Sequence, residues 1–306
     1  MNRKLVSIVF VIIIWSVYSC GNKQAVSEPG PFTQPAEQEP TRAEQVTKAI
    51  AEAYPQIEKA EFRDGDWAVL LHDTWYYYAE SRLLPENLRE EAANYRPIQF
   101  YRYPAELPPW AERPPEETER LSNLRNNNRR STLLRSSFFM DALWQAHDRN
   151  ESYSNLRTVN FLGKSTRVHR LIQEPLSLVE ERIQTIARTD PQIQTWINSI
   201  HYLESWNWRN IAESQSRSYH SYGVAIDILP RSLAGKQTYW LWSADWREDW
   251  WNVPYNERYH PPAAVVSAFE VHGFVWGGKW FLYDTMHFEY RPEVMILNGL
   301  PLETRR

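Results

Sequence analysis

Hydrophobic residues recur at helical spacing in several stretches of the chain. Residues 176–186 carry Leu, Val and Ile three or four positions apart, which predicts an amphipathic helix. Asp190 and Pro191 are typical of the N-cap and the first position of a second helix. A third helix is expected over residues 261–269, with Gly273 as its C-terminal cap.

Short apolar or alternating runs predict strands. They occupy residues 67–71, 74–79, 159–162, 167–171, 274–276 and 279–281. His72-Asp73 is expected to form the turn between the first two, and Gly277-Gly278 favours a two-residue hairpin between the last two. A capping box at residues 41–44 predicts that order begins with a further helix. Helices before and between antiparallel strands predict an α+β fold.

The first 20 residues have the pattern of an export signal. Two basic residues precede an apolar run over residues 5–15, which is too short to span a membrane as a helix. The run ends in Val-Tyr-Ser-Cys, which resembles a bacterial lipobox, so we expect lipidation at Cys20. The protein would then be anchored by lipid in the bacterial cell envelope, facing the periplasm or the outside of the cytoplasmic membrane. The alternative is an ordinary secretory peptide in which this cysteine has no such role.

The composition excludes several classes of protein. A formal net charge of −4 and a pI near 6.1 argue against a nucleic-acid-binding protein, which usually carries a strongly basic surface. A mean hydropathy of −0.61 excludes a protein with several membrane spans. Cys20 is the single cysteine, so intrachain disulfides and cysteine-rich zinc sites are excluded. Any metal must therefore be bound by histidine and carboxylate side chains.

Residues 218–228 combine a strand pattern with groups that bind metals. Alternate apolar residues from Val224 to Ile228 would face one side of a strand and Asp227 the other. A carboxylate within an apolar strand is costly unless a cation meets it. His220 lies just before, and a histidine with an aspartate suggests two ligands of a divalent metal. A third protein ligand would leave the fourth position of a catalytic zinc site open.

Residues 284–289, Asp-Thr-Met-His-Phe-Glu, supply a candidate for the third ligand. His287 would complete a His/Asp/His set, and Asp284 would be the base that takes a proton from the metal-bound water. Residues three apart on a regular strand point to opposite faces. We therefore predict a bend in the two residues between them, which turns Asp284 towards the metal. Glu289 is interpreted as a supporting carboxylate rather than a ligand.

The two motifs together resemble those of the VanY-type zinc D,D-carboxypeptidases, a group that includes L-alanyl-D-glutamate endopeptidases. The first, Ser-x-His-x-x-Gly-x-Ala-x-Asp, is complete over residues 218–227, and the second runs over residues 276–289. The resemblance covers roughly residues 155–295. It implies the hedgehog/D,D-peptidase fold, an antiparallel sheet with flanking helices.

The resemblance also implies a Zn²⁺ cofactor and roles for individual residues. The zinc ligands would be His220, Asp227 and His287, with Asp284 as the catalytic acid/base. Substrate binding would involve an arginine upstream of the first motif, for which Arg209 is best placed and Arg217 is second. Ser218 of the first motif would be a further substrate-binding residue.

The implied function is a zinc-dependent peptidase that hydrolyses peptidoglycan stem-peptide bonds involving D-amino acids, as a D,D-carboxypeptidase. One alternative is an L-Ala-D-Glu or cross-link endopeptidase of the same family, and another is a non-catalytic, metal-containing, envelope-binding lipoprotein. Asp284 favours the enzymes, because a structural metal site needs no such acid. The expected partners are peptidoglycan peptides and, through the N-terminal lipid, a membrane; no nucleic acid is expected.

These patterns divide the chain into four parts. We expect a lipoprotein signal peptide at residues 1–19 and a disordered, proline-rich tether at residues 20–40. Residues 41–150 carry no recognisable chemistry and are interpreted as an accessory α+β region. Residues 151–306 would form the zinc D,D-peptidase-like catalytic domain.

Fifteen tryptophans are unusual for a chain of 306 residues, and ten of them lie between Trp196 and Trp280. We expect most of them to serve packing, since aromatic side chains bury large areas. Stacking on glycan along a cleft is the alternative. The other histidines have no ligand-like partners in the sequence and are expected at the surface or in the core.

Overall fold

The computed structural model describes residues 40–303, apart from 126, 128–130 and 213–215. From Pro40 onward the chain belongs to a single unit. No helix in the described ranges is long and apolar enough to cross a membrane. The predicted signal peptide, lipidated Cys20 and the tether before Pro40 lie outside the described residues and stay predictions.

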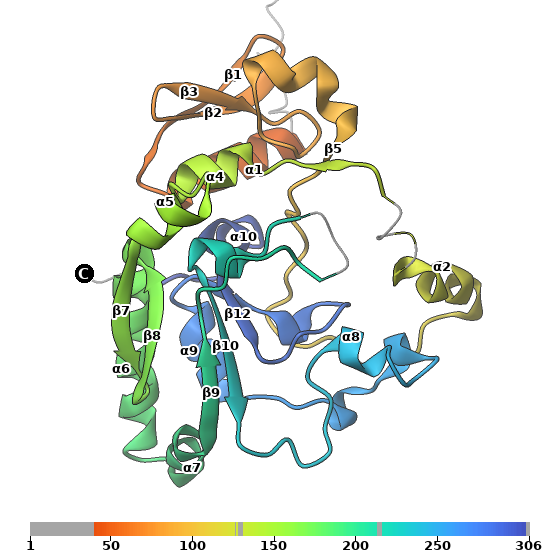
Figure 1. The fold of residues 1–306 in the computed structure, drawn as a ribbon, viewed down its shortest axis with the longest axis vertical. Helices are drawn as coiled ribbons and strands as arrows, with labels where there is room; N and C mark the ends of the chain where they lie inside the picture. The colour runs from red at the N-terminus through yellow and green to blue at the C-terminus, as the bar shows by residue number, and fades with distance from the viewer. Residues whose placement is uncertain (1–39, 126, 128–130, 213–215, 304–306) are drawn as a thin grey trace, which may run out of the picture. The chain divides into compact units, whose positions relative to one another are not determined.

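The described chain begins with a helix packed on a four-stranded antiparallel sheet, red to orange in Figure 1. Helix α1 (Arg42–Ala53) starts at Thr41, whose hydroxyl accepts from the Glu44 amide at 3.2 Å, as the capping box predicted. The strands, in sheet order, are β1 (Ile57–Arg63), β2 (Asp66–Leu71), β3 (Thr74–Tyr77) and β4 (Leu84–Pro85). The hairpin around His72-Asp73 is confirmed. β1 was missed because Ile57 is the only buried residue in it, so no alternation shows in the sequence.

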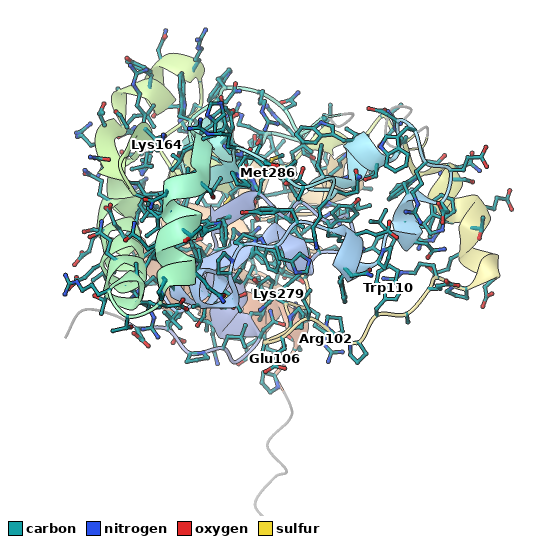
Figure 2. The ribbon with its side chains drawn as sticks, turned by 90° about the horizontal axis from the view of Figure 1, so that it is seen from below. Arg102, Glu106, Trp110, Lys164, Lys279 and Met286 are labelled. Atoms are coloured by element: carbon teal, nitrogen blue, oxygen red, sulfur yellow. The ribbon has the colours of Figure 1, made fainter. Side chains whose placement is uncertain are left out.

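Short elements separated by extended chain follow. They are a 3-10 helix (Glu86–Asn94), β5 (Tyr95–Arg96), which pairs in parallel with β6 (Leu134–Arg135), α2 (Thr118–Ser122), α4 (Phe138–Leu143) and α5 (Arg149–Ser154). The extended segment around Arg102 and Glu106 runs past Lys279 (Figure 2), whose ammonium group donates to the Ala105 carbonyl at 2.6 Å. The same ammonium forms an ion pair of 2.6 Å with Glu270. These contacts fix the segment against the second half of the chain.

An antiparallel hairpin and several helices surround the second sheet. They are β7 (Leu156–Phe161) and β8 (Lys164–His169), then α6 (Gln173–Ala187), α7 (Pro191–Ser199), α8 (Trp240–Ser243), α9 (Ala263–Glu270) and α10 (Pro292–Leu297). The predicted start of α7 is confirmed, since Asp190 accepts from the Gln192 amide with Pro191 at the first helical position. The helix expected after Pro261-Pro262 is α9, and Gly273 follows it with a φ of +88°.

The second four-stranded sheet is antiparallel, with the order β11-β12-β10-β9. Its strands are β9 (Ile200–Glu204), β10 (Ala225–Pro230), β11 (Phe274–Trp276) and β12 (His287–Tyr290). β12, the last strand in the sequence, lies between β10 and β11; Figure 1 shows it beside β10. Antiparallel sheets with helices confirm the α+β class; the closer assignment to the hedgehog/D,D-peptidase fold stays a prediction.

The hairpin predicted at Gly277-Gly278 is wrong. β11 pairs with β12, and Gly277–Lys279 form a 3-10 turn that leads into a loop. Neither glycine has the positive φ that two-residue hairpin turns require. Both positions require glycine for another reason: neighbouring atoms lie too close to leave room for a side chain. A Cβ on Gly277 would lie 2.5 Å from the Asp284 carbonyl oxygen, and one on Gly278 would collide with the indole of Trp276.

One hydrophobic core draws residues from both sides of the predicted boundary at residue 150. It includes Val46 and Ile50 of α1 as well as Val179 of α6 and Phe288 of β12, all completely buried. The division into accessory region and catalytic domain therefore does not correspond to two separate cores. The first sheet and α1 pack as a layer on the structure that carries the second sheet.

Candidate metal centre

The segment before β10 is shaped so that His220 faces the sheet. Tyr219–Tyr222 form a 3-10 turn, and its N-cap Ser218 accepts from the His220 amide at 3.3 Å. Gly223 ends the turn with a φ of +71°, and a Cβ there would lie 2.6 Å from the Leu156 side chain. Glycine meets both conditions, because it tolerates positive φ and needs no space for a side chain.

β10 separates apolar from ligating side chains, as its alternation predicted. Val224, Ile226 and Ile228 are completely buried in the core. Asp227 belongs to the other face and is paired in register with His287 of β12 and Glu204 of β9. The sheet thus presents a carboxylate and an imidazole from neighbouring central strands.

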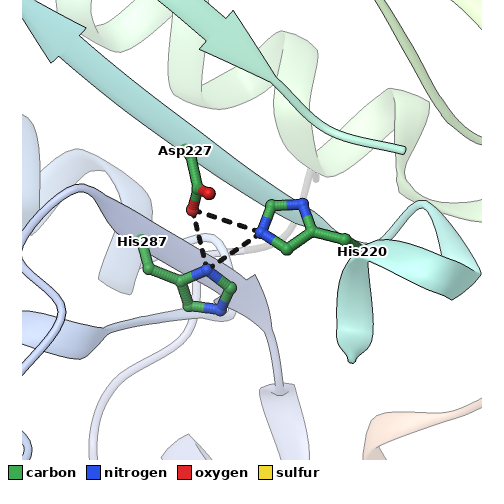
Figure 3. A group of neighbouring side chains, drawn as sticks. All are labelled: His220, Asp227 and His287. Atoms are coloured by element: carbon green, nitrogen blue, oxygen red, sulfur yellow. Dashed lines mark hydrogen bonds and ion pairs between the residues drawn. The ribbon is translucent and has the colours of Figure 1, made fainter. Parts of the chain in front are cut away.

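The structure brings His220, Asp227 and His287 together (Figure 3). His287 Nδ1 lies 2.9 Å from Asp227 Oδ1 and 3.2 Å from His220 Nε2. His220 Nε2 lies 3.2 Å from the same Asp227 oxygen. All three side chains are buried. Tetrahedral zinc with bonds of about 2.0–2.1 Å separates its donor atoms by about 3.3 Å, close to this triangle.

The other nitrogen of each histidine is already engaged. His220 Nδ1 lies 2.6 Å from the Ser205 carbonyl oxygen, and His287 Nε2 lies 3.2 Å from Glu289 Oε2. Both acceptors require an N–H, which leaves His220 Nε2 and His287 Nδ1 for a metal ion or a second proton. Burial lowers the pKa of His287, but Asp227 and Glu289 raise it well above its usual range, so without a metal the ring holds that second proton. Two such nitrogens beside a carboxylate need a cation between them, either this proton or a metal ion. The donor set therefore fits a divalent metal with its outer hydrogen bonds in place.

The charge state of Asp227 suits a metal ligand. Burial alone would raise its pKa, but His220 and His287 outweigh this effect and hold the pKa well below its usual range. The carboxyl group is therefore ionised at neutral pH, as binding of a metal requires.

Asp284 lies in a tight turn before β12. The His287 amide donates to the Asp284 carbonyl at 3.2 Å, so Thr285 and Met286 form the predicted bend. The Asp284 Oδ1 atom is buried and has no hydrogen-bond partner among the described residues. Burial raises the pKa of Asp284 to about 8, and the Asp227 carboxylate adds to the rise. The Asp284 side chain is partly buried, and its carboxyl group also accepts a hydrogen bond from the Met286 amide. An acid with one unpartnered oxygen and a pKa near neutrality is suited to proton transfer.

The three predicted substrate-binding residues have different surroundings. Arg209 is exposed, and its charge acts against the raised pKa of Asp284. Ser218 is buried and caps the turn that carries His220. Arg217 is also buried, where its guanidinium donates to Asp141 at 2.7 Å and stacks on Trp208 at 4.3 Å. Arg217 thus holds the first motif to the segment around Asp141, whereas Arg209 has a free approach from solvent.

Further ionic groups, not predicted from the sequence, continue from the His220, Asp227 and His287 cluster. Glu289 was expected to be a supporting carboxylate, and it lies against His287; Arg291 and Glu293 follow it at alternate positions. The repeat His-x-Glu-x-Arg-x-Glu was visible, and a period of two on a strand would have placed these groups on one face. The contact of Ser205 with His220 could not be predicted from the residue type, because Ser205 contributes its backbone carbonyl.

Most of the tryptophans between the two motifs serve packing, as expected. Trp240, Trp250 and Trp251 form a second core cluster, which includes Tyr283, the residue before Asp284. Trp242 and Trp246 are the exceptions, with 48% and 64% of their surface exposed. The cluster supports the loop that carries the candidate acid.

Two family models match parts of the chain. Residues 46–100 match a domain of unknown function (DUF8518). Residues 212–290, about a quarter of the chain, match a family described as D-alanyl-D-alanine carboxypeptidase. No curated protein and no solved structure matches the chain. The second match contains His220, Asp227, Asp284 and His287. The part of the chain that carries the candidate metal centre is thus similar to D-alanyl-D-alanine carboxypeptidases, and this similarity supports a peptidase that acts on peptidoglycan peptides.

Proposed function

We propose that the chain is a zinc-dependent D,D-carboxypeptidase of VanY type, which removes the terminal D-amino acid from peptidoglycan stem peptides. The observation that carries the proposal is the convergence of two imidazole nitrogens and a carboxylate, with the Asp284 carboxyl group nearby and its Oδ1 atom unpartnered among the described residues. This convergence lies within the segment that matches the carboxypeptidase family. A purely structural site would need no further acid with an unpartnered oxygen.

The ligand atoms in this proposal are His220 Nε2, Asp227 Oδ1 and His287 Nδ1. A bound zinc ion supplies Lewis acidity towards the scissile carbonyl and lowers the pKa of water. Asp284 Oδ1 accepts the proton that the attacking water gives up and returns it to the nitrogen of the leaving amino acid. Asp284 must be ionised to accept this proton, and a dication held by the three ligands would lower its raised pKa accordingly.

Arg209 is proposed to bind the carboxylate of the terminal D-amino acid. Its guanidinium is exposed, and it is close enough to Asp284 to influence the pKa of that acid. A guanidinium and a carboxylate form paired, charge-assisted hydrogen bonds, which would orient the end of the peptide. Ser218 then acts through His220, whose turn it caps.

The proposal includes a location, which rests on the sequence of residues 1–40 alone. Export and lipidation at Cys20 would tether the enzyme in the bacterial envelope, within reach of peptidoglycan. Labelling with a fatty acid, followed by mass spectrometry of the mature N-terminus, tests this part separately from the activity.

Purified chain loaded with zinc and incubated with muropeptides tests the activity. Mass spectrometry should detect the loss of one terminal D-alanine. Cuts inside the stem or the cross-link would instead indicate an endopeptidase. Asp284→Asn should lower kcat by about 10²–10⁴-fold while zinc content is kept. Asp249→Asn, at an exposed aspartate, is the matched control and should keep full activity. Full activity of Asp284→Asn would contradict the proposal.

A further inference from the structure

We propose that the region matching the domain of unknown function completes the metal centre, with Tyr54 and Arg291 as positioning residues for His287. This inference rests on the proposed metal centre but not on which peptide bond is cut. In this inference, residues 46–100 complete a network of hydrogen bonds and ion pairs that holds His287 in place. Nothing in the match itself suggests such a task.

A continuous chain of side-chain contacts joins α1 to the metal centre. His287 Nε2 lies 3.2 Å from Glu289 Oε2, and Glu289 Oε1 accepts from Arg291 at 3.3 Å. Arg291 Nε also donates to Glu293. The other oxygen of Glu293 accepts from the Tyr54 hydroxyl at 2.6 Å, across 239 positions of sequence. Each of these five side chains is buried.

The guanidinium of Arg291 is enclosed by groups from both halves of the chain. One nitrogen donates to the Gln99 carbonyl at 3.0 Å, and the rings of Phe100 and Tyr101 lie 6.0 Å away. Tyr219, which directly precedes His220, stacks on it at 4.9 Å. Arg291 therefore contacts the segments that carry both histidine ligands, and residues 99–101 cover it on another side.

Each buried carboxylate in this network accepts hydrogen bonds from two side chains, which stabilise its charge. Glu289 receives hydrogen bonds from His287 and Arg291, and Glu293 receives them from Arg291 and Tyr54. Without the Tyr54 hydroxyl, Glu293 keeps Arg291 as its single side-chain donor and draws it away from Glu289. His287 then loses the fixed orientation of its ring. Loss of such outer partners typically weakens metal binding.

Tyr54→Phe tests the inference, because it removes a single hydroxyl group. Zinc affinity, measured by competition with a chelator, should fall by about three- to tenfold, less than for direct loss of an outer partner. The visible absorption of the Co²⁺-loaded protein should change, since it reports ligand geometry. Tyr77→Phe is the matched control: its hydroxyl belongs to the same matched region and donates to Asp64 at 2.9 Å, outside the network that reaches His287. The control should keep the affinity and the spectrum.

Glu293→Gln is the second variant, which decides the question if Tyr54→Phe does not fold. It keeps the shape of the side chain but removes the charge that holds Arg291, and a similar loss of affinity is expected. Unchanged affinity and spectrum would overturn the inference, as would equal losses in Tyr77→Phe or a parent chain that binds no zinc. A parent chain that binds zinc but cleaves no muropeptide contradicts the proposed function and leaves the inference intact.

Discussion

Asp227 and His287 stand directly opposite each other in the pair β10–β12, with Asp227 Oδ1 2.9 Å from His287 Nδ1. The opposite face of β10 is buried in the core through Ile226 and Ile228. A shift of one residue would exchange the two faces, which would bury Asp227 in the core and expose its apolar neighbours. The register of the sheet therefore fixes the geometry of the ligands.

Removal of zinc should destabilise the fold. Zinc at about 1,000 times its dissociation constant is expected to contribute about 4 kcal/mol. For a protein of this size that corresponds to a melting temperature about 8–16 °C higher than in a chelator. Calorimetry with and without chelator measures the difference. The Asp227→Asn variant should show a much smaller response, and equal melting temperatures of the parent in both conditions would argue against a metal site.

Arg209→Ala should weaken the use of peptides that end in a free carboxylate. Loss of a charged hydrogen-bond pair costs about 1.5–3 kcal/mol, so kcat/KM should fall by about 10–100-fold. A peptide with an amidated C-terminus should be cleaved equally by parent and variant. Arg231→Ala, at another exposed arginine, is the control and should behave as the parent. Equal losses on both peptides would exclude the proposed role of Arg209.

Gly223→Ala should destabilise the protein more than Gly163→Ala. Both glycines have a positive φ, of +71° and +77°, so the backbone strain of an alanine is similar. A Cβ at position 163 meets nothing within 4 Å, whereas one at position 223 lies 2.6 Å from Leu156 and 3.0 Å from the backbone nitrogen of His169. The difference should be about 1–3 kcal/mol in chemical denaturation. Equal losses would mean that the close approach at Gly223 is unimportant.

His169 should make the fold less stable in acid. Burial lowers its pKa to about 4, and its neutral ring lies 3.0 Å from the Trp144 carbonyl while accepting from the Leu171 amide. Between pH 6.5 and about 4 the unfolded chain binds a proton that the folded chain excludes. Stability is therefore lost as the pH falls through this window, by up to about 3 kcal/mol. Denaturation curves should show a shallower loss for His169→Gln, and parallel curves would exclude this residue as the cause.

Local sequence patterns were sufficient to predict that His220, Asp227 and His287 come together. The alternation of β10, the turn before it and the bend between Asp284 and His287 are each set by a few adjacent residues. The pairing of their strands then follows from the shared core face. The hairpin predicted at Gly277-Gly278 was wrong because a glycine dipeptide is equally suited to a hairpin turn and to the close approach of another chain segment.

Contacts between distant segments could not be read from the sequence. Tyr54 gives no local indication that it reaches Glu293, and Arg217 gives none that it pairs with Asp141. Both pairs form because burial of a charge demands a partner, and the fold determines which partner is near. Residues 41–150 therefore show no recognisable motif in the sequence, although Tyr54 belongs to the hydrogen-bond network that reaches His287.

The central place of β12 has a consequence for how the protein is made. β12 is the last strand of the sheet to be synthesised, yet it must insert between β10 and β11. A chain terminated before residue 287 lacks both the strand that joins them and His287. Incomplete polypeptides released from the ribosome before this point therefore cannot bring His220, Asp227 and His287 together, so the proposed activity depends on translation through β12.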